Sequence, residues 1–303
     1  MKNIYDLLDL AKEEIGYTEK DSGFELDGKT RNIGNSNHTK YGRDISNAGL
    51  NGYNGYAWGC SFQFWLDLIT FGKKVALELW NMTDDTYVGY NTLSTLNVFK
   101  SHNKIGNAPK LGALIIFNHL HVGRVINYYD IEGVTYIECL EGDYSCNLNK
   151  PGMVVLKRMK ANDVSIKCYC YIDYDQFCIG DPTWIKDNDG WKYFLCYDRH
   201  VANSWFKDTD GALYWFDKTE HAIHDKWLDF AGYRYWFKSD CRMASSSWIT
   251  FEGNRYYLTI YGSMAKDCYV KDVANNVYLY LDKFGVCDEK PVATLPPFAK
   301  VVV

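Results

Sequence analysis

Proline is scarce in this chain of 303 residues, and its cysteines form no dense pattern. There are only 6 prolines, and none of the 10 cysteines forms a C-x-x-C pair with another. This cysteine content is below that of disulfide-stapled scaffolds, and a zinc site is not expected without paired cysteines. We therefore expect reduced and mostly buried thiols, with no metal and no cofactor.

An excess of one charge and long apolar runs are also missing. The net charge of −5, with 23% charged residues, provides no general attraction to nucleic acid or to an anionic membrane. No apolar run reaches the about 18–20 residues that span a bilayer, so membrane insertion is not expected. The start, MKNIYDLLDLAKEEIGY, carries acidic residues and lacks the apolar core of a signal peptide, which predicts synthesis in a cytoplasm.

Aromatic residues, in contrast, are abundant and unevenly distributed. The chain has 25 Tyr, 15 Phe and 10 Trp, and 25 of these 50 rings lie in residues 184–288. Gly180 and Pro182 interrupt the chain just before this region. We therefore predict a first domain over residues 1–175, a linker over 176–183, a repeat domain over 184–288 and a C-terminal tail over 289–303.

The aromatic region is periodic. Its anchor residues are separated by 21, 22, 21 and 21 residues, and they are Trp184, Trp205, Trp227, Trp248 and Tyr269. Each anchor is followed by a turn signal, such as Asp210-Gly211, and then by a second aromatic cluster. Each unit therefore predicts a two-stranded hairpin, and such hairpins must stack to bury their rings. We predict an all-β solenoid of about five aromatic hairpins.

Segments such as WFKDTDGALYWFD and WLDFAGYRYWFKSDCRMA resemble the choline-binding or glucan-binding cell-wall repeats of Gram-positive bacteria and their phages. The resemblance implies ligand sites between successive hairpins, each an aromatic box, with incomplete boxes at the two ends. A quaternary ammonium or a sugar could lie on such ring faces, so choline-bearing teichoic acid and wall polysaccharide both remain open. The rings implied as ligand-binding are Trp184, Trp191, Trp205, Tyr214, Trp215, Trp227, Tyr235, Trp236, Trp248, Tyr256 and Tyr257.

The first part of the chain predicts helices followed by strands. Apolar residues at helical spacing indicate a helix over 3–16, and the stripe Phe62, Trp65, Leu66 and Ile69 indicates a second helix over 60–71. A polar loop is expected between them, over about 18–57. The predicted strands are 113–117, 121–128, 134–140 and 152–158.

A cysteine at the start of a helix, followed by strands that bear histidine, is typical of a thiol hydrolase. The helix N-terminus lowers the pKa of the thiol, and the histidine accepts its proton. Cys60 and His121 fit these roles, with His119 as a rival base. The alternative is that Cys60 is an inert buried thiol and that His121 is an ordinary strand residue. Asp187 with Asp189, and Asp208 with Asp210, could bind calcium, but neither turn has the spacing of an EF-hand, so calcium dependence stays open.

Five motifs occur in the order of the landmarks of the CHAP amidase/endopeptidase domain of phage lysins, which this part resembles: EIGYTEK, NHTKYGR, GYAWGCSFQFWLDLITFG, HVGRV and LEGDYS. The resemblance implies a papain-like α+β fold, with Cys60 as nucleophile, His121 as base, Glu141 orienting the base and Asp143 beside them. In a gapless comparison from Trp58 to Gly72, however, Gly59 falls on the position of the nucleophile. A shift by one helical residue rotates a side chain by about 100°.

Together these features predict an endolysin of a phage or prophage. It would be a peptidoglycan hydrolase, either an N-acetylmuramoyl-L-alanine amidase or a peptidoglycan endopeptidase, held on the wall by its repeats. It would be made in the host cytoplasm without a signal peptide and act on the wall after release, in an oligomeric state that stays open. Two alternatives are a catalytically decayed protein that binds the cell wall or serves in adhesion, and a bacteriocin-like toxin effector with the same fold.

Overall fold

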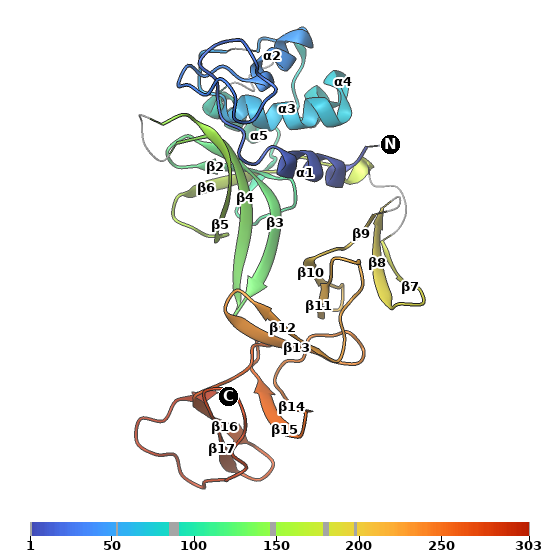
Figure 1. Cartoon of the computed structure of the whole chain (residues 1–303), viewed down its shortest axis with the longest axis vertical. Helices are drawn as coiled ribbons and strands as arrows, with labels where there is room; N and C mark the ends of the chain where they lie inside the picture. The colour runs from blue at the N-terminus through green and yellow to red at the C-terminus, as the bar shows by residue number, and fades with distance from the viewer. Residues whose placement is uncertain are drawn as a thin grey trace. The chain divides into compact units, whose positions relative to one another are not determined.

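A computed structural model of the chain describes residues 2–52, 54–84, 91–145, 150–177, 182–196 and 199–302. It contains two compact units (Figure 1). Unit 1 comprises Met1–Asp130 and Val134–Ile179, and unit 2 comprises Ile131–Gly133 and Gly180–Val303. The chain is mostly β with few helices. Within the described ranges, no helix combines the length and the apolar character that crossing a membrane requires.

Two predicted helices are present in unit 1. Helix α1 (Ile4–Glu13) begins at Asn3, whose side chain accepts hydrogen bonds from two backbone N–H groups of the first turn. Helix α3 (Gly59–Phe71) ends at Gly72, which has a positive φ of 82°. The predicted apolar stripe of this helix is wrong at one position. The Ile69 side chain is 49% exposed, because the last turns bury Leu68 instead.

Three further α-helices were not predicted: α2 (Lys40–Asn47), α4 (Lys73–Leu79) and α5 (Thr92–Ser101). The expectation of a continuous loop over 18–57 is therefore wrong, because Thr39 caps α2 inside it by accepting a hydrogen bond from the backbone of Gly42. A short 3₁₀ helix, η2 (Asp175–Phe177), follows near the end of unit 1.

The strands of unit 1 form one six-stranded sheet in the order β1-β6-β2-β3-β4-β5. The four predicted strands are β2 (Leu114–Phe117), β3 (Val122–Ile131), β4 (Val134–Tyr144) and β5 (Met153–Lys160), and β1 (Ile105–Gly106) and β6 (Ile166–Cys170) were not predicted. The helices gather on one face of this sheet (Figure 1). Successive side chains of β2 therefore point to opposite faces of the sheet. Leu114 and Ile116 belong to the hydrophobic core shared with the helices, and Ile115 and Phe117 belong to a second hydrophobic cluster.

Unit 2 contains five antiparallel hairpins, as the period of the anchors predicts. We number them 1 to 5 in chain order: β7 (Thr183–Lys186) with β8 (Trp191–Cys196), β10 (Ser204–Lys207) with β11 (Leu213–Phe216), β12 (Lys226–Phe230) with β13 (Tyr233–Phe237), β14 (Ser247–Phe251) with β15 (Asn254–Leu258), and β16 (Cys268–Asp272) with β17 (Val277–Leu281). The two-residue turn of hairpin 3 has positive φ at both Ala231 and Gly232, the conformation that matches the twist of paired strands.

The first and last hairpins each have a third strand. Strand β9 (Arg199–His200) pairs with β8, and β18 (Val301–Val302) pairs in parallel with β16. Tyr278 of β17 also forms a bridge with Val292. The described part of the expected tail, residues 289–302, therefore folds back onto hairpin 5. Residues 178–181 of the predicted linker lie outside the described residues.

Candidate functional site

The start of helix α3 is fixed by two carboxylates that reach it from distant parts of the chain. Trp58, the residue before the helix, is fully buried. Its backbone N–H donates to Asp143 Oδ2 at 2.9 Å, and its indole N–H donates to Glu19 Oε2 at 2.9 Å. Burial, and then the nearby charge of Glu19, raise the pKa of Asp143 to about 6. The first turn of α3 is therefore held in one orientation against β4.

Gly59 faces the predicted catalytic histidine. A Cβ atom placed on Gly59 would lie 3.3 Å from Cε1 of His121 and 3.3 Å from the carbonyl oxygen of Gly142. His121 Nε2 lies 3.3 Å from Glu141 Oε2, which leaves Nδ1 of the same ring for a partner at the helix start. The histidine and the carboxylate thus lie together as the sequence predicts, and the backbone position opposite them carries no side chain.

Glu141 is almost completely buried and has a second partner that sequence reasoning missed. Lys157 Nζ, on the neighbouring strand β5, lies 3.1 Å from the same Oε2 atom that faces His121. Burial raises the pKa of Glu141, but the hydrogen bond with His121 and the charge of Lys157 outweigh it and hold the pKa below its usual value. The carboxylate is therefore ionised at neutral pH.

Cys60 points away from this pair. Its Sγ lies 3.4 Å from Thr92 Oγ1 and 4.0 Å from Thr95 Oγ1, both on helix α5, and the residue is only 3% exposed. Burial raises the pKa of the Cys60 thiol to about 11, against the smaller lowering effect of the two hydroxyls. The expectation that the helix N-terminus yields a thiolate here is wrong, because loss of hydration dominates at this position.

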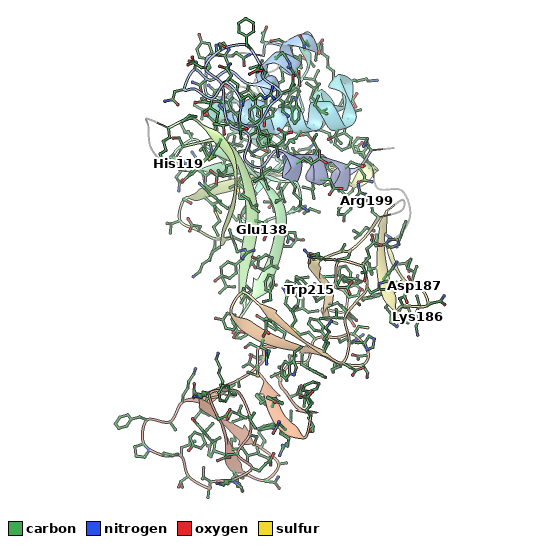
Figure 2. All side chains as sticks on the ribbon, viewed as in Figure 1. His119, Glu138, Lys186, Asp187, Arg199 and Trp215 are labelled. Atoms are coloured by element: carbon green, nitrogen blue, oxygen red, sulfur yellow. The ribbon has the colours of Figure 1, made fainter. Side chains whose placement is uncertain are left out.

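His119, the rival base, is an exposed residue of the loop before β3 (Figure 2). Its ring stacks at 5.4 Å from the ring of Phe117 and at 5.9 Å from that of His121. His119 is therefore a neighbour of the site, whereas His121 is the ring that faces both Glu141 and Gly59.

In unit 2, the predicted rings come together between neighbouring hairpins. Within each of hairpins 2 and 3 the anchor tryptophan pairs across the strands with a second tryptophan, Trp205 with Trp215 and Trp227 with Trp236. Each anchor then meets a tyrosine of the following hairpin. The ring-centroid distances are 4.6 Å for Trp184–Tyr214, 5.1 Å for Trp205–Tyr235 and 5.2 Å for Trp227–Tyr256. We call these contacts interfaces 1, 2 and 3. Figure 2 labels Trp215, which belongs to interface 2.

The residue three positions after each anchor completes these interfaces, and sequence reasoning did not single it out. Phe230 lies 5.9 Å from Trp205 in interface 2, and Phe251 lies 6.4 Å from Trp227 in interface 3. In interface 1 the equivalent residue is Asp208, whose Oδ2 accepts a hydrogen bond of 2.8 Å from the Trp184 indole. Interface 1 therefore differs from the next two in having a carboxylate in its wall.

The ends of the array do not behave alike. Trp184 contacts the rings of Trp191, at 6.3 Å, and of Tyr193, at 5.3 Å, so interface 1 has as many rings as the inner ones. We call the position between hairpins 4 and 5 interface 4. There Trp248 and Tyr257 pair within hairpin 4, but Leu279 of hairpin 5 takes the register of the tyrosine. Only the C-terminal end therefore lacks a ring at the tyrosine position.

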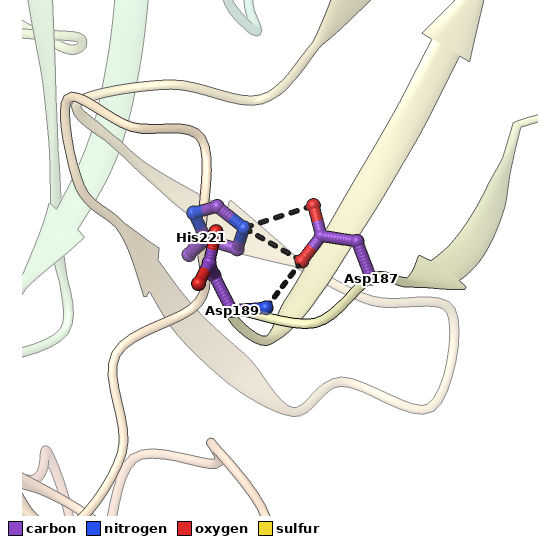
Figure 3. A group of neighbouring side chains, drawn as sticks. All are labelled: Asp187, Asp189 and His221. Atoms are coloured by element: carbon purple, nitrogen blue, oxygen red, sulfur yellow. Dashed lines mark hydrogen bonds and ion pairs between the residues drawn. The ribbon is translucent and has the colours of Figure 1, made fainter.

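One charged cluster lies in unit 2 beside interface 1. His221 Nε2 lies 3.0 and 3.1 Å from the two carboxylate oxygens of Asp187 (Figure 3), and Lys192 Nζ lies 3.1 Å from Asp187 Oδ2. Asp189 completes a group of three side chains whose ligand atoms lie within 4.8 Å of one another. Such donors can hold a cation, but Asp187 is already paired with the Lys192 ammonium and with the imidazole of His221.

No protein-family model matches this sequence, and no curated protein matches it. Among solved structures, the chain is similar to a cell-wall endolysin of phage Cp-1 complexed with choline, at 20% identity and a TM-score of 0.32, over 53% of this chain and 48% of that one. It is similar to a modular autolysin of Streptococcus pneumoniae at 23% identity and a TM-score of 0.27, over 35% and 28%. It is also similar to an alternansucrase of Leuconostoc mesenteroides at 24% identity and a TM-score of 0.32, over 35% and 10%.

The structural neighbours thus include cell-wall endolysins and autolysins and a choline-binding domain of Streptococcus pneumoniae. The endolysin, autolysin and alternansucrase matches each span less than half of the other protein. The TM-scores are low, so the function of this chain is inferred from its own contacts.

Proposed function

We propose that this chain binds bacterial cell walls and that its N-terminal unit keeps the frame of a cysteine amidase without the nucleophile. The observation that carries this proposal is the position of Gly59. Glycine faces the His121–Glu141 pair, at the place from which a thiol would attack. The only cysteine nearby in sequence, Cys60, is directed at Thr92 in the core.

Chemistry at this site needs a nucleophile that the histidine can deprotonate. The glycine side chain is a hydrogen atom, so no acyl-enzyme can form at position 59. The Cys60 thiol is neutral at pH 7, and the side chain of a neighbouring helical residue points about 100° away. Of the readings that the sequence left open, the decayed wall-binding protein therefore fits these contacts better than the lytic endolysin or the toxin effector.

The arrangement of the pair supports a papain-like origin of unit 1. Helix α3 packs on the sheet, with His121 next to the start of β3 and Glu141 on β4. Two acceptors, Glu19 and Asp143, still orient Trp58 at the head of the helix. These contacts position the backbone before residue 59 and hold the site in shape without a thiol.

Wall binding would be the task of the aromatic interfaces in unit 2. The faces of tryptophan and tyrosine rings attract a quaternary ammonium and stack on sugars. Choline-bearing teichoic acid and wall polysaccharide are both ligands of this kind. Several weak sites on one array would act together, because the second contact with the same polymer is effectively intramolecular. Peptidoglycan itself would then be bound rather than cut.

The test compares binding and lysis on purified Gram-positive walls, with and without choline in their teichoic acids. The wild-type chain should sediment with the walls and release no fragments detectable by mass spectrometry. If the wild type released fragments and the Cys60→Ala variant did not, the proposal would be overturned and the lytic endolysin would be the better interpretation. Failure to sediment with any wall would overturn its binding half.

A second variant tests the meaning of Gly59. In Gly59→Cys the new thiol would lie next to the imidazole of His121, after a shift of a few tenths of an ångström at Gly142. Pairing with an imidazolium lowers the pKa of a thiol, so this variant should react with iodoacetamide at pH 6. The matched variant Gly59→Cys with His121→Ala should lose that reactivity, and Gly59→Ala reports on folding alone.

A further inference from the structure

In interfaces 3 and 4, an arginine side chain of the protein already lies over the ring of the anchor tryptophan. The guanidinium carbon of Arg234 lies 5.7 Å from the ring centroid of Trp227, and that of Arg255 lies 4.5 Å from the ring centroid of Trp248. Both distances fall within the range in which a ring face attracts a cation. The anchor rings of hairpins 3 and 4 are thus engaged before any ligand arrives.

Each of these guanidinium groups is also fixed by a carboxylate. Arg234 forms a bidentate ion pair with Asp229, in which Nε donates to Oδ1 at 2.7 Å and Nη2 donates to Oδ2 at 2.9 Å. The two residues lie opposite each other in hairpin 3. Arg255 lies 3.0 Å from Glu289, in the segment that folds back onto hairpin 5. A planar guanidinium held in this way keeps its place over the ring, whereas a free side chain would move through solvent.

Strand alternation places Arg234 on the side of hairpin 3 where a ligand would enter. Trp227 and Asp229 are two residues apart on β12, and Arg234 and Trp236 are two residues apart on β13, so all four side chains share one side of the hairpin. Tyr256 of hairpin 4 meets Trp227 on that side. Arg234 therefore belongs to interface 3.

The anchor rings of the first two interfaces carry no such cation, although in hairpin 1 the Lys186 Nζ atom lies 5.4 Å from the ring centroid of Trp191. The register position of Arg234 and Arg255 is held by Leu213 in hairpin 2 and by Trp191 in hairpin 1. In the described part of the chain, no lysine or arginine lies over the Trp184 or Trp205 ring. Interface 1 instead carries the Asp208 carboxylate, and Arg242, which pairs with Asp210 at 2.7 Å, interacts with the Tyr214 hydroxyl rather than lying over a ring face.

We propose that Arg234 and Arg255 are built-in occupants of interfaces 3 and 4, and that an ammonium ligand such as choline is confined to interfaces 1 and 2. This inference rests on the proposed role of the repeats in wall binding, and it names the interfaces that take a cation. The two ends of the array then differ in specificity, although their backbones repeat. A sugar, which carries no charge, would not be excluded from interfaces 3 and 4 in the same way.

The experiment follows the indole N–H signals of the full-length chain by NMR during titration with choline chloride, each signal being assigned by a Trp→Phe variant. In the wild type, choline should shift the signals of Trp184 and Trp205 but not those of Trp227 and Trp248. In Arg234→Gln the Trp227 signal should respond as well, at choline concentrations at least about two- to fivefold below any at which the wild-type Trp227 signal begins to shift, the factor that corresponds to one exposed cation–π contact. Arg255→Gln should do the same for Trp248.

Arg158→Gln is the matched control, because the guanidinium of Arg158 lies 5.8 Å from the Tyr129 ring centroid and pairs with Glu138, but in unit 1. It should leave every titration unchanged. A Trp227 signal that responds equally in the wild type and in Arg234→Gln would overturn the inference, and so would a complete lack of response in all variants while the chain still binds walls. A chain that binds neither walls nor choline would instead overturn the proposed function.

Discussion

The reactivity of the Cys60 thiol depends on whether its side chain faces the histidine or the hydrophobic core. At pH 7 a thiol with a pKa of about 11 is ionised in only about one molecule in ten thousand. We therefore expect iodoacetamide to modify Cys60 in the folded chain far more slowly than after unfolding in urea. Mass spectrometry of the tryptic peptides measures both rates. Rapid labelling of Cys60 in the native chain would show that its side chain faces the histidine after all.

Asp143 makes a pH-dependent contribution that can be isolated. The pKa of its carboxyl rises from 3.8 in the unfolded chain to about 6 in the folded one. Between these values the folded state retains a proton that the unfolded state has released. The free energy of unfolding therefore falls as the pH increases through this window, and below pH 3.8 the contribution is fully present.

In Asp143→Asn this slope should disappear, while the amide oxygen can still accept the hydrogen bond of the Trp58 backbone. Relative to the wild type, the variant should gain of the order of 2 kcal/mol between pH 4 and pH 7, since one pKa unit corresponds to about 1.4 kcal/mol. Urea unfolding at a series of pH values measures the difference, in which the opposite contribution of Glu141 cancels. Parallel stability profiles for the two proteins would contradict the prediction.

The sequence could predict part of the candidate site and not the rest. The motifs predict that His121 and Glu141 approach each other, and they lie 3.3 Å apart. They could not predict the direction of Cys60, because that depends on Thr92 and Thr95, whose helix was itself not predicted. Glu19 and Lys157 were missed for a related reason. Their roles come from contacts between segments that are far apart in the sequence, and the spacing of residues within a short motif cannot predict such contacts.

At the level of elements, unit 1 depends on a buried charge pair between α3 and β3. Arg124 Nη2 donates to Asp67 Oδ2 at 2.7 Å, and both side chains are fully buried. Tyr174 donates to the other carboxylate oxygen at 2.6 Å, and the Trp80 indole donates to Oδ2 at 2.9 Å. Arginine and aspartate here have satisfied partners, which is the condition under which buried charges are tolerated.

Arg124→Met should destabilise the chain by about 3–5 kcal/mol, because it leaves the Asp67 carboxylate buried without a counter-charge. Adding Asp67→Asn removes that charge, and the amide oxygen can still accept from the Trp80 indole while the amide N–H donates to the Tyr174 hydroxyl, so the double variant should recover part of the loss. Urea denaturation followed by circular dichroism measures both. A double variant that is less stable than Arg124→Met alone would contradict this account of the pair.

Elements with a regular period could be predicted, and short elements could not. The five hairpins follow from ring spacing and turn residues that are repeated along the chain. Helix α2 has only 8 residues, and its cap, Thr39, lies in a polar stretch, so its sequence does not stand out from a loop. The terminal strands β9 and β18 have two residues each. Strands this short contain too few residues for a period to be recognised in the sequence.

At the scale of the whole molecule, the residues behind the two proposed roles lie in different units. The division of the chain at Ile179–Gly180 leaves the histidine–carboxylate pair in unit 1 and all aromatic interfaces in unit 2. Each unit has its own hydrophobic clusters. If the proposals hold, the two parts can be altered independently, because the contacts that build each site lie within one unit.

This independence predicts how the chain responds to truncation between the units. Phe177 stacks on Phe71 at 4.9 Å, and Tyr174 stacks on the same ring at 5.8 Å, so unit 1 needs its residues up to 177. A fragment of residues 1–177 should unfold cooperatively in thermal denaturation, and one of residues 1–175 should melt at a lower temperature. Residues 182–303 should sediment with purified walls as the full chain does, whereas residues 1–177 should not. Wall binding that survives only in the intact chain would show that recognition requires both units.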